Sequence, residues 1–266
     1  MNRRLAGIAI LVGLAACAGV TTPTDLPLPS EAATTSSETS VPSAAPTSEA
    51  QLPGFKFWDL PDLMQESVGR YSEFLDVPTM SVGVYSLPSA ASDTQSPHGQ
   101  DEVYYIVEGE AQLVVQDEPI PVSPGSIVYV RAGVEHRFEP ITDDLRTVVL
   151  FSSTPTDAEA KTTEAFQLSE LTTGAPSRNT WNVFLSAPTL RFGLYRLPAS
   201  VGGDDPLIHT FDEINFVVSG RGTFRVEDFD LEIGPDSVMF VPATLAHSFH
   251  SLNDDLDVLI FWEGGG

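Results

Sequence analysis

The scarcest residue type in this 266-residue chain is cysteine, which occurs once, at Cys17. One cysteine excludes a disulfide within the chain. In an exported protein such a residue is a free thiol, half of an intermolecular disulfide, or a modified side chain. The hydrophobic content of 42% is ordinary for a globular protein, so a sizeable core can form without disulfides.

Positive charge is also scarce. The chain has 13 Lys and Arg residues against 37 Asp and Glu, and its formal net charge is −24. Only Lys56 and Lys161 are lysines. So acidic a surface repels phosphate backbones, which excludes general nucleic-acid binding. The same charge is consistent with cation accumulation, with basic partners or with a merely well-solvated surface, and the sequence does not choose among these.

Long hydrophobic runs are missing as well. The apolar stretch 5–14 follows Arg3 and Arg4, and it is shorter than the about 20 residues that a membrane-spanning helix needs. This is the form of a secretory signal peptide. It ends in LAAC, residues 14–17, which resembles the lipobox of bacterial lipoproteins.

The lipobox resemblance implies cleavage before Cys17 and a lipid on its sulfur. We therefore expect an exported lipoprotein, anchored on the extracytoplasmic side of a membrane, at the cell surface or in the periplasm. Cleavage by ordinary signal peptidase, with a free secreted product, is the alternative. Residues 18–53 are rich in Ser, Thr, Pro and Ala and contain no aromatic residue, so we expect a disordered tether there.

The rest of the chain contains an internal repeat. The segment SPHGQDEVYYIVEG at 96–109 returns as LIHTFDEINFVVSG at 207–220. The residues that recur at one constant spacing are His98 and His209, Asp101 and Asp212, Glu102 and Glu213, Gly109 and Gly220, and His136 and His247. The copies run from about 55 to 152 and from about 164 to 263, so we place two domains at 54–158 and 159–266.

Both copies have the pattern of β-structure. The expected strands of the first copy are short and rich in Val, Ile, Tyr and Phe, and they lie at 80–87, 102–107, 111–116, 126–132 and 146–151. Helix is expected only near 60–75. Two repeats of six or more short strands predict an all-β protein with two tandem antiparallel barrels or sandwiches.

In each copy a histidine precedes a glutamate by four residues. On a straight strand four residues span about 13 Å, whereas two ligands of one metal each lie about 2.1 Å from it. The chain must therefore bend between His98 and Glu102, and Gly99 permits the bend. His136 lies far enough along the chain for a hairpin to return it to the same barrel mouth.

Two imidazoles and one carboxylate with open positions suit a divalent transition metal. Four of the five histidines recur with a carboxylate at matched spacing, which favours metal ligands over isolated structural histidines. The candidate ligands are His98, Glu102 and His136 in the first copy and His209, Glu213 and His247 in the second.

These blocks resemble the two sequence motifs of the cupin superfamily. The first family motif runs roughly H-x-H, three or four residues, E, six residues, G; the second runs roughly G, five residues, P-x-G, two residues, H. The matching residues are His98, Glu102, Gly109, Gly125, Gly133 and His136 in the first copy, and His209, Glu213, Gly220, Pro242 and His247 in the second. The resemblance covers nearly all of 55–263 and implies a bicupin with two tandem jelly-roll barrels.

The chain departs from the family at the first histidine of the first motif, where it has Ser96 and Leu207. Leucine cannot coordinate a metal and serine is a poor ligand, so Gln95 or Gln100 is a candidate extra ligand for the first site. In the second copy, Asp236 and Thr244 replace the motif glycines.

Arg131 stands where the second motif usually has proline, and it is a candidate partner for a substrate carboxylate. An exposed arginine that balances the acidic surface is the competing interpretation. Tyr104 and Tyr105 are neighbours on an expected strand, so at most one of them points inward, and we expect core packing for either.

For function, the resemblance implies dioxygenase, decarboxylase or oxidase chemistry on a small organic acid or phenolic compound, with Fe, Mn, Zn, Ni or Cu as the metal. The missing histidine leaves two alternatives open. One is a non-catalytic cell-surface module that binds a metal, a sugar or a small metabolite, and the other is a purely structural second barrel. Whether the chain is an enzyme therefore stays open.

Overall fold

Two six-stranded antiparallel sheets dominate the protein, whose structure is a computed structural model that describes residues 52–67, 70–152 and 162–264. These residues belong to one compact unit, Pro46–Gly266. The predicted signal peptide, Cys17 and nearly all of the predicted tether lie outside the described residues. Within the described ranges, neither helix is long and apolar enough to cross a membrane.

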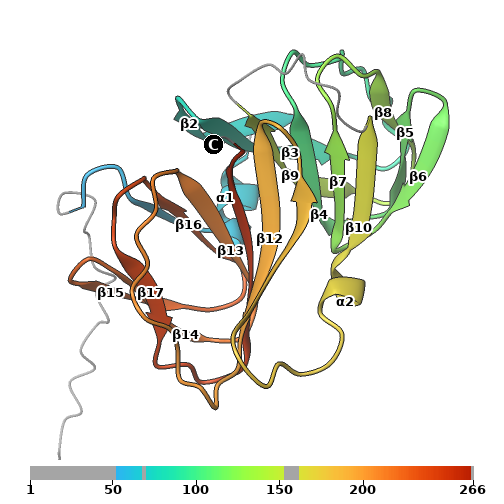
Figure 1. Ribbon diagram of the computed structural model, residues 1–266. Helices are drawn as coiled ribbons and strands as arrows, with labels where there is room; N and C mark the ends of the chain where they lie inside the picture. Colours follow the sequence, from blue (N-terminus) through green and yellow to red (C-terminus); the bar gives the residue numbers. More distant parts are fainter. Residues whose placement is uncertain (1–51, 68–69, 153–161, 265–266) are drawn as a thin grey trace, which may run out of the picture. The chain divides into compact units, whose positions relative to one another are not determined.

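The first barrel combines a six-stranded sheet, in the order β10-β7-β4-β9-β3-β2, with a three-stranded sheet, in the order β6-β5-β8 (Figure 1). Its strands are β2 (Tyr71–Val77), β3 (Met80–Leu87), β4 (Glu102–Glu108), β5 (Ala111–Val115), β6 (Glu118–Val122), β7 (Ser126–Val130), β8 (His136–Ile141), β9 (Leu145–Ser152) and β10 (Thr163–Gln167).

The second barrel repeats this arrangement, with the orders β1-β16-β13-β18-β12-β11 and β15-β14-β17. Its strands are β1 (Lys56–Asp59), β11 (Thr180–Ser186), β12 (Leu190–Leu197), β13 (Glu213–Ser219), β14 (Gly222–Val226), β15 (Phe229–Ile233), β16 (Ser237–Val241), β17 (His247–His250) and β18 (Leu256–Glu263). The predicted all-β class with two tandem antiparallel jelly-roll barrels is confirmed.

The five strands predicted in the first copy correspond to β3, β4, β5, β7 and β9. Strand β6 was not among them, and it contains Pro119 and Pro121, a residue type that is rare in strands. β6 lies at the edge of its sheet, where a residue without an N–H group is tolerated.

The helix expected near 60–75 is only partly present. Helix α1 (Leu60–Glu66) begins after Asp59, whose side chain accepts a hydrogen bond from the Asp62 N–H at 3.4 Å. Residues 71–75 of the segment instead belong to strand β2, most of whose side chains alternate in burial. A second helix, α2 (Leu168–Leu171), forms one turn after β10 and has no long period in the sequence.

The central strands separate two hydrophobic cores. On β4, Val103 packs into a cluster that joins the two six-stranded sheets, whereas Tyr104 and Ile106 pack inside the first barrel. The same alternation places Val148 on the side between the sheets and Val149 inside the barrel. Strands buried on both faces read as nearly continuous apolar runs, which explains sequences such as EVYYIV.

The two copies exchange their first strands. β1 of the first copy pairs with β16 of the second barrel, with Phe57 opposite Met239. β10, which opens the second copy, pairs in turn with β7 of the first barrel. Each six-stranded sheet therefore contains one strand from the other copy.

The residue just before each candidate glutamate ligand links the two barrels. The Asp101 carboxyl is fully buried and accepts hydrogen bonds from the Thr189 hydroxyl and, at 2.9 Å, from the Ala132 N–H. The second copy repeats the link, since the Thr79 hydroxyl donates to Asp212 at 2.7 Å. Threonine and aspartate belong to opposite barrels in both links, so the barrels are tied reciprocally.

The motif glycines mark turns with positive φ. Gly109 and Gly220 have φ of 87° and 86°, and a Cβ on Gly109 would clash with the carbonyl oxygen of Asp144. Asp236 and Thr244 have φ of 72° and 74°, so the second barrel keeps these left-handed turns without glycine.

Replacing Gly109 with alanine will destabilise the protein. The positive φ alone costs a non-glycine residue about 1–3 kcal/mol, and the clash with the Asp144 carbonyl adds to this cost. Urea unfolding measures the loss. Gly99→Ala is the matched control, because a Cβ there meets no atom within 4 Å, and its effect should stay within about 0.5 kcal/mol. Equal losses of unfolding free energy in Gly109→Ala and Gly99→Ala would contradict this account of the turn.

Candidate metal centres

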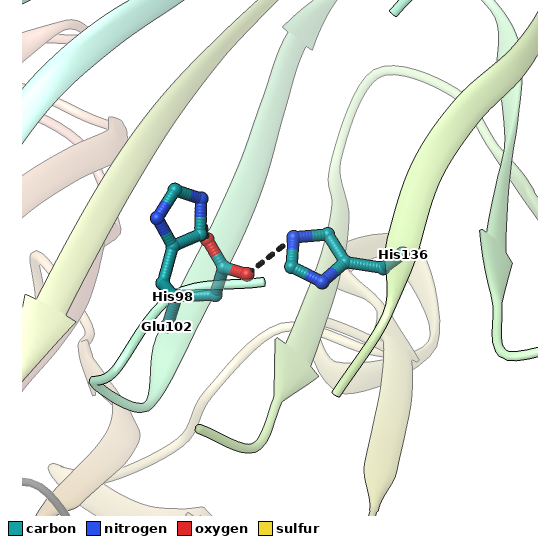
Figure 2. Close-up of side chains that lie close together, drawn as sticks. All are labelled: His98, Glu102 and His136. Atoms are coloured by element: carbon teal, nitrogen blue, oxygen red, sulfur yellow. Dashed lines mark ion pairs between the residues drawn. The ribbon is translucent and has the colours of Figure 1, made fainter. Parts of the chain in front are cut away.

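Three predicted ligands of the first copy lie together. His98 is in the loop before β4, Glu102 begins β4 and His136 begins β8, so the chain bends between His98 and Glu102 as their spacing requires. His136 Nε2 is 2.6 Å from Glu102 Oε1, and His98 Nε2 is 3.7 Å from Glu102 Oε2. Figure 2 shows the Glu102 carboxylate between the two rings. His98 is 34% exposed, whereas the other two side chains are buried.

The second copy forms the same triad. His209 Nε2 and His247 Nε2 each lie 3.0 Å from an oxygen of Glu213. In each triad, one donor atom from every residue lies within 4.8 Å of the others. The second triad is more enclosed, since His209 is 14% exposed. Both sets of three residues can therefore contact a single small ion.

Backbone carbonyls orient the imidazoles. His136 Nδ1 is 2.7 Å from the carbonyl oxygen of Val134, and His209 Nδ1 is 2.7 Å from that of Phe211. His247 Nδ1 is 3.1 Å from a carbonyl in the same way. A nitrogen in this position donates its proton, which leaves Nε2 with its lone pair facing the glutamate. This is the orientation that a metal-binding histidine needs.

Two buried polar atoms in the triads have no hydrogen-bond partner, namely Glu102 Oε2 and His209 Nε2. The distance from His209 Nε2 to Glu213 is short, but the pair does not meet the angular requirement of a hydrogen bond. Buried polar atoms are nearly always satisfied, so one unpartnered atom in each triad, an oxygen in the first and a nitrogen in the second, is consistent with a metal-ligand role. The donor set of two nitrogens and one carboxylate suits a divalent transition metal.

The carboxylates and imidazoles perturb each other. Burial lowers the pKa of His136, but the hydrogen bond and charge of Glu102 outweigh it, and the net pKa is raised above 6.5. The pKa of His247 is raised for the same reasons, with Glu213 as its partner. Burial raises the pKa of Glu213, but the close contacts and charges of His209 and His247 outweigh burial and lower the pKa to about 2. Glu213 is therefore ionised at neutral pH.

Metal affinity of the first triad will fall as the pH falls. A metal and a proton compete for His136 Nε2, so below the raised pKa of His136 the affinity should drop about tenfold per pH unit for each proton displaced. In the metal-free protein, folding stability changes with pH in the opposite direction from metal affinity. The protonated pair stabilises the fold fully below about pH 6.5, and this contribution is lost as the pH rises through the raised pKa. Zinc titration calorimetry at several pH values tests the first trend, and affinity that does not change with pH would contradict it.

The candidate extra ligands lie near the first triad but have other contacts. Gln95 Oε1 accepts a hydrogen bond from the Tyr104 hydroxyl at 2.9 Å, and Gln100 Nε2 donates to the carbonyl oxygen of Ser152 at 2.6 Å. Both side chains line the cavity beside His98. Ser96 is exposed. A metal-ligand role for either glutamine stays a prediction.

Sequence reasoning missed the role of Tyr104. Its ring is buried inside the barrel as strand alternation allows, but its hydroxyl is also 3.1 Å from His136 Nε2. Tyr105 points to the opposite face and packs against the cluster between the sheets. The alternation predicted one inward tyrosine, but only the return of His136 on β8 shows what that tyrosine contacts.

A cavity of about 400 Å³ adjoins the first triad. Its lining residues are Tyr71, Glu73, Ser81, Tyr85, Gln95, His98, Gln100, Tyr104, Val149 and Phe151. Arg131, the predicted carboxylate partner, is not among them; it follows β7, where its N–H donates to the Thr162 carbonyl at 3.1 Å. Its role in substrate binding stays a prediction.

A cavity of about 440 Å³ adjoins the second triad. Its lining residues are Trp181, Tyr195, Asp204, Leu207, Ile208, His209, Phe211, Glu213, Asn215, His247, Phe249, Ile260 and Trp262. Leu207, which occupies the place of the missing histidine, is 54% exposed at this cavity. Volumes of this size are typical of small-molecule sites.

Comparison with known proteins gives the same fold and several similar sequences. A model of the cupin domain matches residues 83–152. The chain is 50% identical over 84 residues to the uncharacterized protein SCO3923 of Streptomyces coelicolor, covering 32% of this chain and 80% of that protein. It is 41% identical over 56 residues to an acireductone dioxygenase of Bacillus thuringiensis, but it spans only 32% of that enzyme and 19% of its own length is matched.

Two solved structures share the fold. A cupin 2 conserved barrel domain protein from Leptotrichia buccalis superposes with a TM-score of 0.65 and 16% identity, over 78% of this chain and 96% of that one. A salicylate 1,2-dioxygenase from Pseudaminobacter salicylatoxidans superposes with a TM-score of 0.64 and 14% identity, over 79% and 84%. A further structure of that dioxygenase holds adducts with gentisate. At these identities the likeness establishes the fold alone.

Proposed function

Because this chain belongs to the cupin superfamily, we propose that it is a metal-binding bicupin whose two triads each hold a divalent transition metal, Fe, Mn, Zn, Ni or Cu. The observation that carries the proposal is the pair of matched triads with unpartnered donor atoms, Glu102 Oε2 in one and His209 Nε2 in the other. The carbonyl contacts that orient the imidazoles support it.

As an enzyme, the protein would be a metal-dependent dioxygenase, decarboxylase or oxidase that acts on a small organic acid or phenolic compound. A bound metal supplies a Lewis acid or redox centre that orients and activates the substrate. His98 faces the first cavity, so a substrate there lies directly beside the triad. The Tyr104 hydroxyl lies 3.1 Å from His136 Nε2, and the Phe151 ring packs against the His98 ring with their centroids 4.9 Å apart. The similarity to acireductone dioxygenase over 56 residues also favours an oxygenase.

The second candidate is a non-catalytic module that binds a metal, a sugar or a small metabolite. Two observations favour it, since Leu207 stands where the family has a ligand and Ser96 is exposed. We also propose that the chain is exported and anchored through lipid on Cys17, with a tether at 18–53 and domains at 54–158 and 159–266. The LAAC sequence and the repeat support these proposals.

Elemental analysis of the purified full-length chain tests the metal sites. We expect about two metals per chain, with one lost in His98→Ala and the other in His209→Ala. About one metal, lost only with His98, would restrict the proposal to the first barrel. No metal, even after reconstitution with Fe, Mn, Zn, Ni and Cu in turn, would overturn it. Circular dichroism of each variant checks that the barrels remain folded.

A further inference from the structure

The two cavities can be compared position by position, because the repeats place both on the same frame. The Tyr85 hydroxyl donates to Asp93 at 2.6 Å, and the Tyr195 hydroxyl donates to Asp204 at 2.9 Å. Tyr71 lies opposite Tyr85 on the neighbouring strand, and Trp181 lies opposite Tyr195 in the same register. The walls can therefore be compared at these matching positions by side-chain identity.

At several matching positions the second copy has a larger or more apolar side chain than the first. These pairs, first copy then second, are Tyr71 and Trp181, Gln100 and Phe211, Val149 and Ile260, Phe151 and Trp262, Ser96 and Leu207, and Pro97 and Ile208. Asn215 in place of Tyr104 is the exception, since it is more polar. Glu73, which lines the first cavity, is replaced by Val183. Outside the triads and the Tyr–Asp pairs, the first cavity offers amides and a carboxylate from Gln95, Gln100 and Glu73, whereas the second offers mainly rings and aliphatic side chains.

The rings of the second cavity form a continuous aromatic wall. Trp181 and Trp262 have ring centroids 5.2 Å apart, and Phe211 lies 6.0 Å from Trp262 at an interplanar angle of 28°. The Phe211 ring also stacks on His209 at 4.2 Å, with the planes 1° apart. Trp181 is 47% exposed, and Ile208 is 68% exposed at the mouth. Large apolar side chains left exposed around a cavity are typical of a site for an apolar ligand.

The charges of the second cavity argue against an ionic ligand. Among the described residues, no Lys or Arg lines it, and Arg191, the counterpart of Ser81, is not part of the lining. Beside the proposed metal site, an anionic ligand would instead face the carboxyl group of Asp204. A cationic ligand would find Asp204 already engaged by Tyr195 and by the Phe249 N–H at 2.6 Å.

One polar atom of the wall is available for a ligand. Asn215, the counterpart of Tyr104, lines the cavity and is fully buried, and its Nδ2 donates to Glu213 at 2.9 Å. Its Oδ1 has no hydrogen-bond partner. A buried acceptor without a partner favours a ligand that brings a donor, such as a hydroxyl group.

We propose that the second cavity binds an uncharged, flat, mostly apolar ring compound that carries a hydroxyl group, and that the first cavity does not share this preference. The inference rests on the proposed function in so far as the cavity adjoins the second proposed metal site. It narrows the ligand of that site to a neutral phenolic compound rather than an organic acid. The aromatic wall stacks on the ring, and Asn215 Oδ1 accepts from the hydroxyl.

Calorimetric titration of the full-length protein with 1-naphthol, with 1-naphthoate as the anionic probe of the same ring, tests the proposal. We expect saturable binding of 1-naphthol at one site per chain and at least tenfold weaker binding of 1-naphthoate. Phe211→Gln and Trp181→Tyr install the residues of the first cavity, and each should weaken 1-naphthol binding about tenfold or more. Tyr71→Ala in the first cavity is the matched control and should leave the affinity unchanged.

Equal or tighter binding of 1-naphthoate would overturn the proposal. An unchanged affinity for 1-naphthol in both Phe211→Gln and Trp181→Tyr would also overturn it, and so would a loss of 1-naphthol affinity in Tyr71→Ala. Titrations after chelation and after zinc loading separate this proposal from the metal proposal. Binding of 1-naphthol to a protein that takes up no metal would support the ring site while the metal sites fail. Two bound metals without 1-naphthol binding would reject the ring site alone.

Discussion

Replacing Glu102 with glutamine should remove the metal from the first triad while the barrel stays folded. The substitution keeps the size of a side chain that is 1% exposed, so packing is retained. It removes the negative charge and turns one oxygen into an NH₂ group, which cannot coordinate a metal. The loss of affinity should exceed the roughly 10–100-fold that removal of an outer-shell partner costs. Metal analysis and zinc titration measure it.

Glu213→Gln is the matched control for this prediction, because it should empty the second triad and leave the first unchanged. Two metals retained in Glu102→Gln would contradict the assignment of Glu102 as a ligand. The same variant separates the two candidate functions once a ligand is known. An enzyme of the first barrel loses turnover, whereas a binding module changes only its affinity.

Replacing Asp101 with alanine should cost on the order of 2–6 kcal/mol of unfolding free energy. The Thr189 hydroxyl and the Ala132 N–H would both lose their acceptor in a fully buried place, and each unpaired buried group costs about 1–3 kcal/mol. Urea unfolding with an unchanged dependence on denaturant measures the loss.

Thr189→Val isolates the link between the barrels, because it removes only the donor from the second barrel. We expect this substitution to lower the free energy of unfolding by about 1–3 kcal/mol. Thr79→Val is the corresponding change in the other link and should cost less, since Thr79 and Asp212 are half-buried and water can replace the lost donor. Wild-type stability in both valine variants would mean that the cross-barrel hydrogen bonds contribute nothing.

Much of the fold could be predicted from local patterns. The apolar runs around Val103 and Val148 are strands because both of their faces are buried, and the repeat alone indicates two barrels. Backbone demands hidden in single residues were harder to predict. Strand β6 contains Pro119 and Pro121, which are compatible with a strand only at a sheet edge. Part of the expected helix near 60–75 is β2, because pairing with β3 decides its conformation.

The candidate triads could be predicted because their spacing recurs in both copies. The structure brings the three residues of each triad together. The contacts around them could not, because they come from distant segments. Tyr104 reaches His136 only through the barrel closure, and Asp101 meets Thr189 of the opposite barrel. Asp101 was visible as a repeated residue, but nothing in the repeat indicates that its partner lies in the other copy.

The exchange of β1 and β10 determines when each barrel can complete its large sheet during synthesis. During translation the first barrel cannot complete its large sheet until residues 163–167 have been made, so the edge of β7 stays open while the chain grows. Strand β1 in turn stays without its partner until β16 has been made. Unpaired strand edges invite association with other chains, so this stage is the one most in need of protection by chaperones. Because each large sheet contains one strand from the other copy, deletion of either copy would remove part of both barrels.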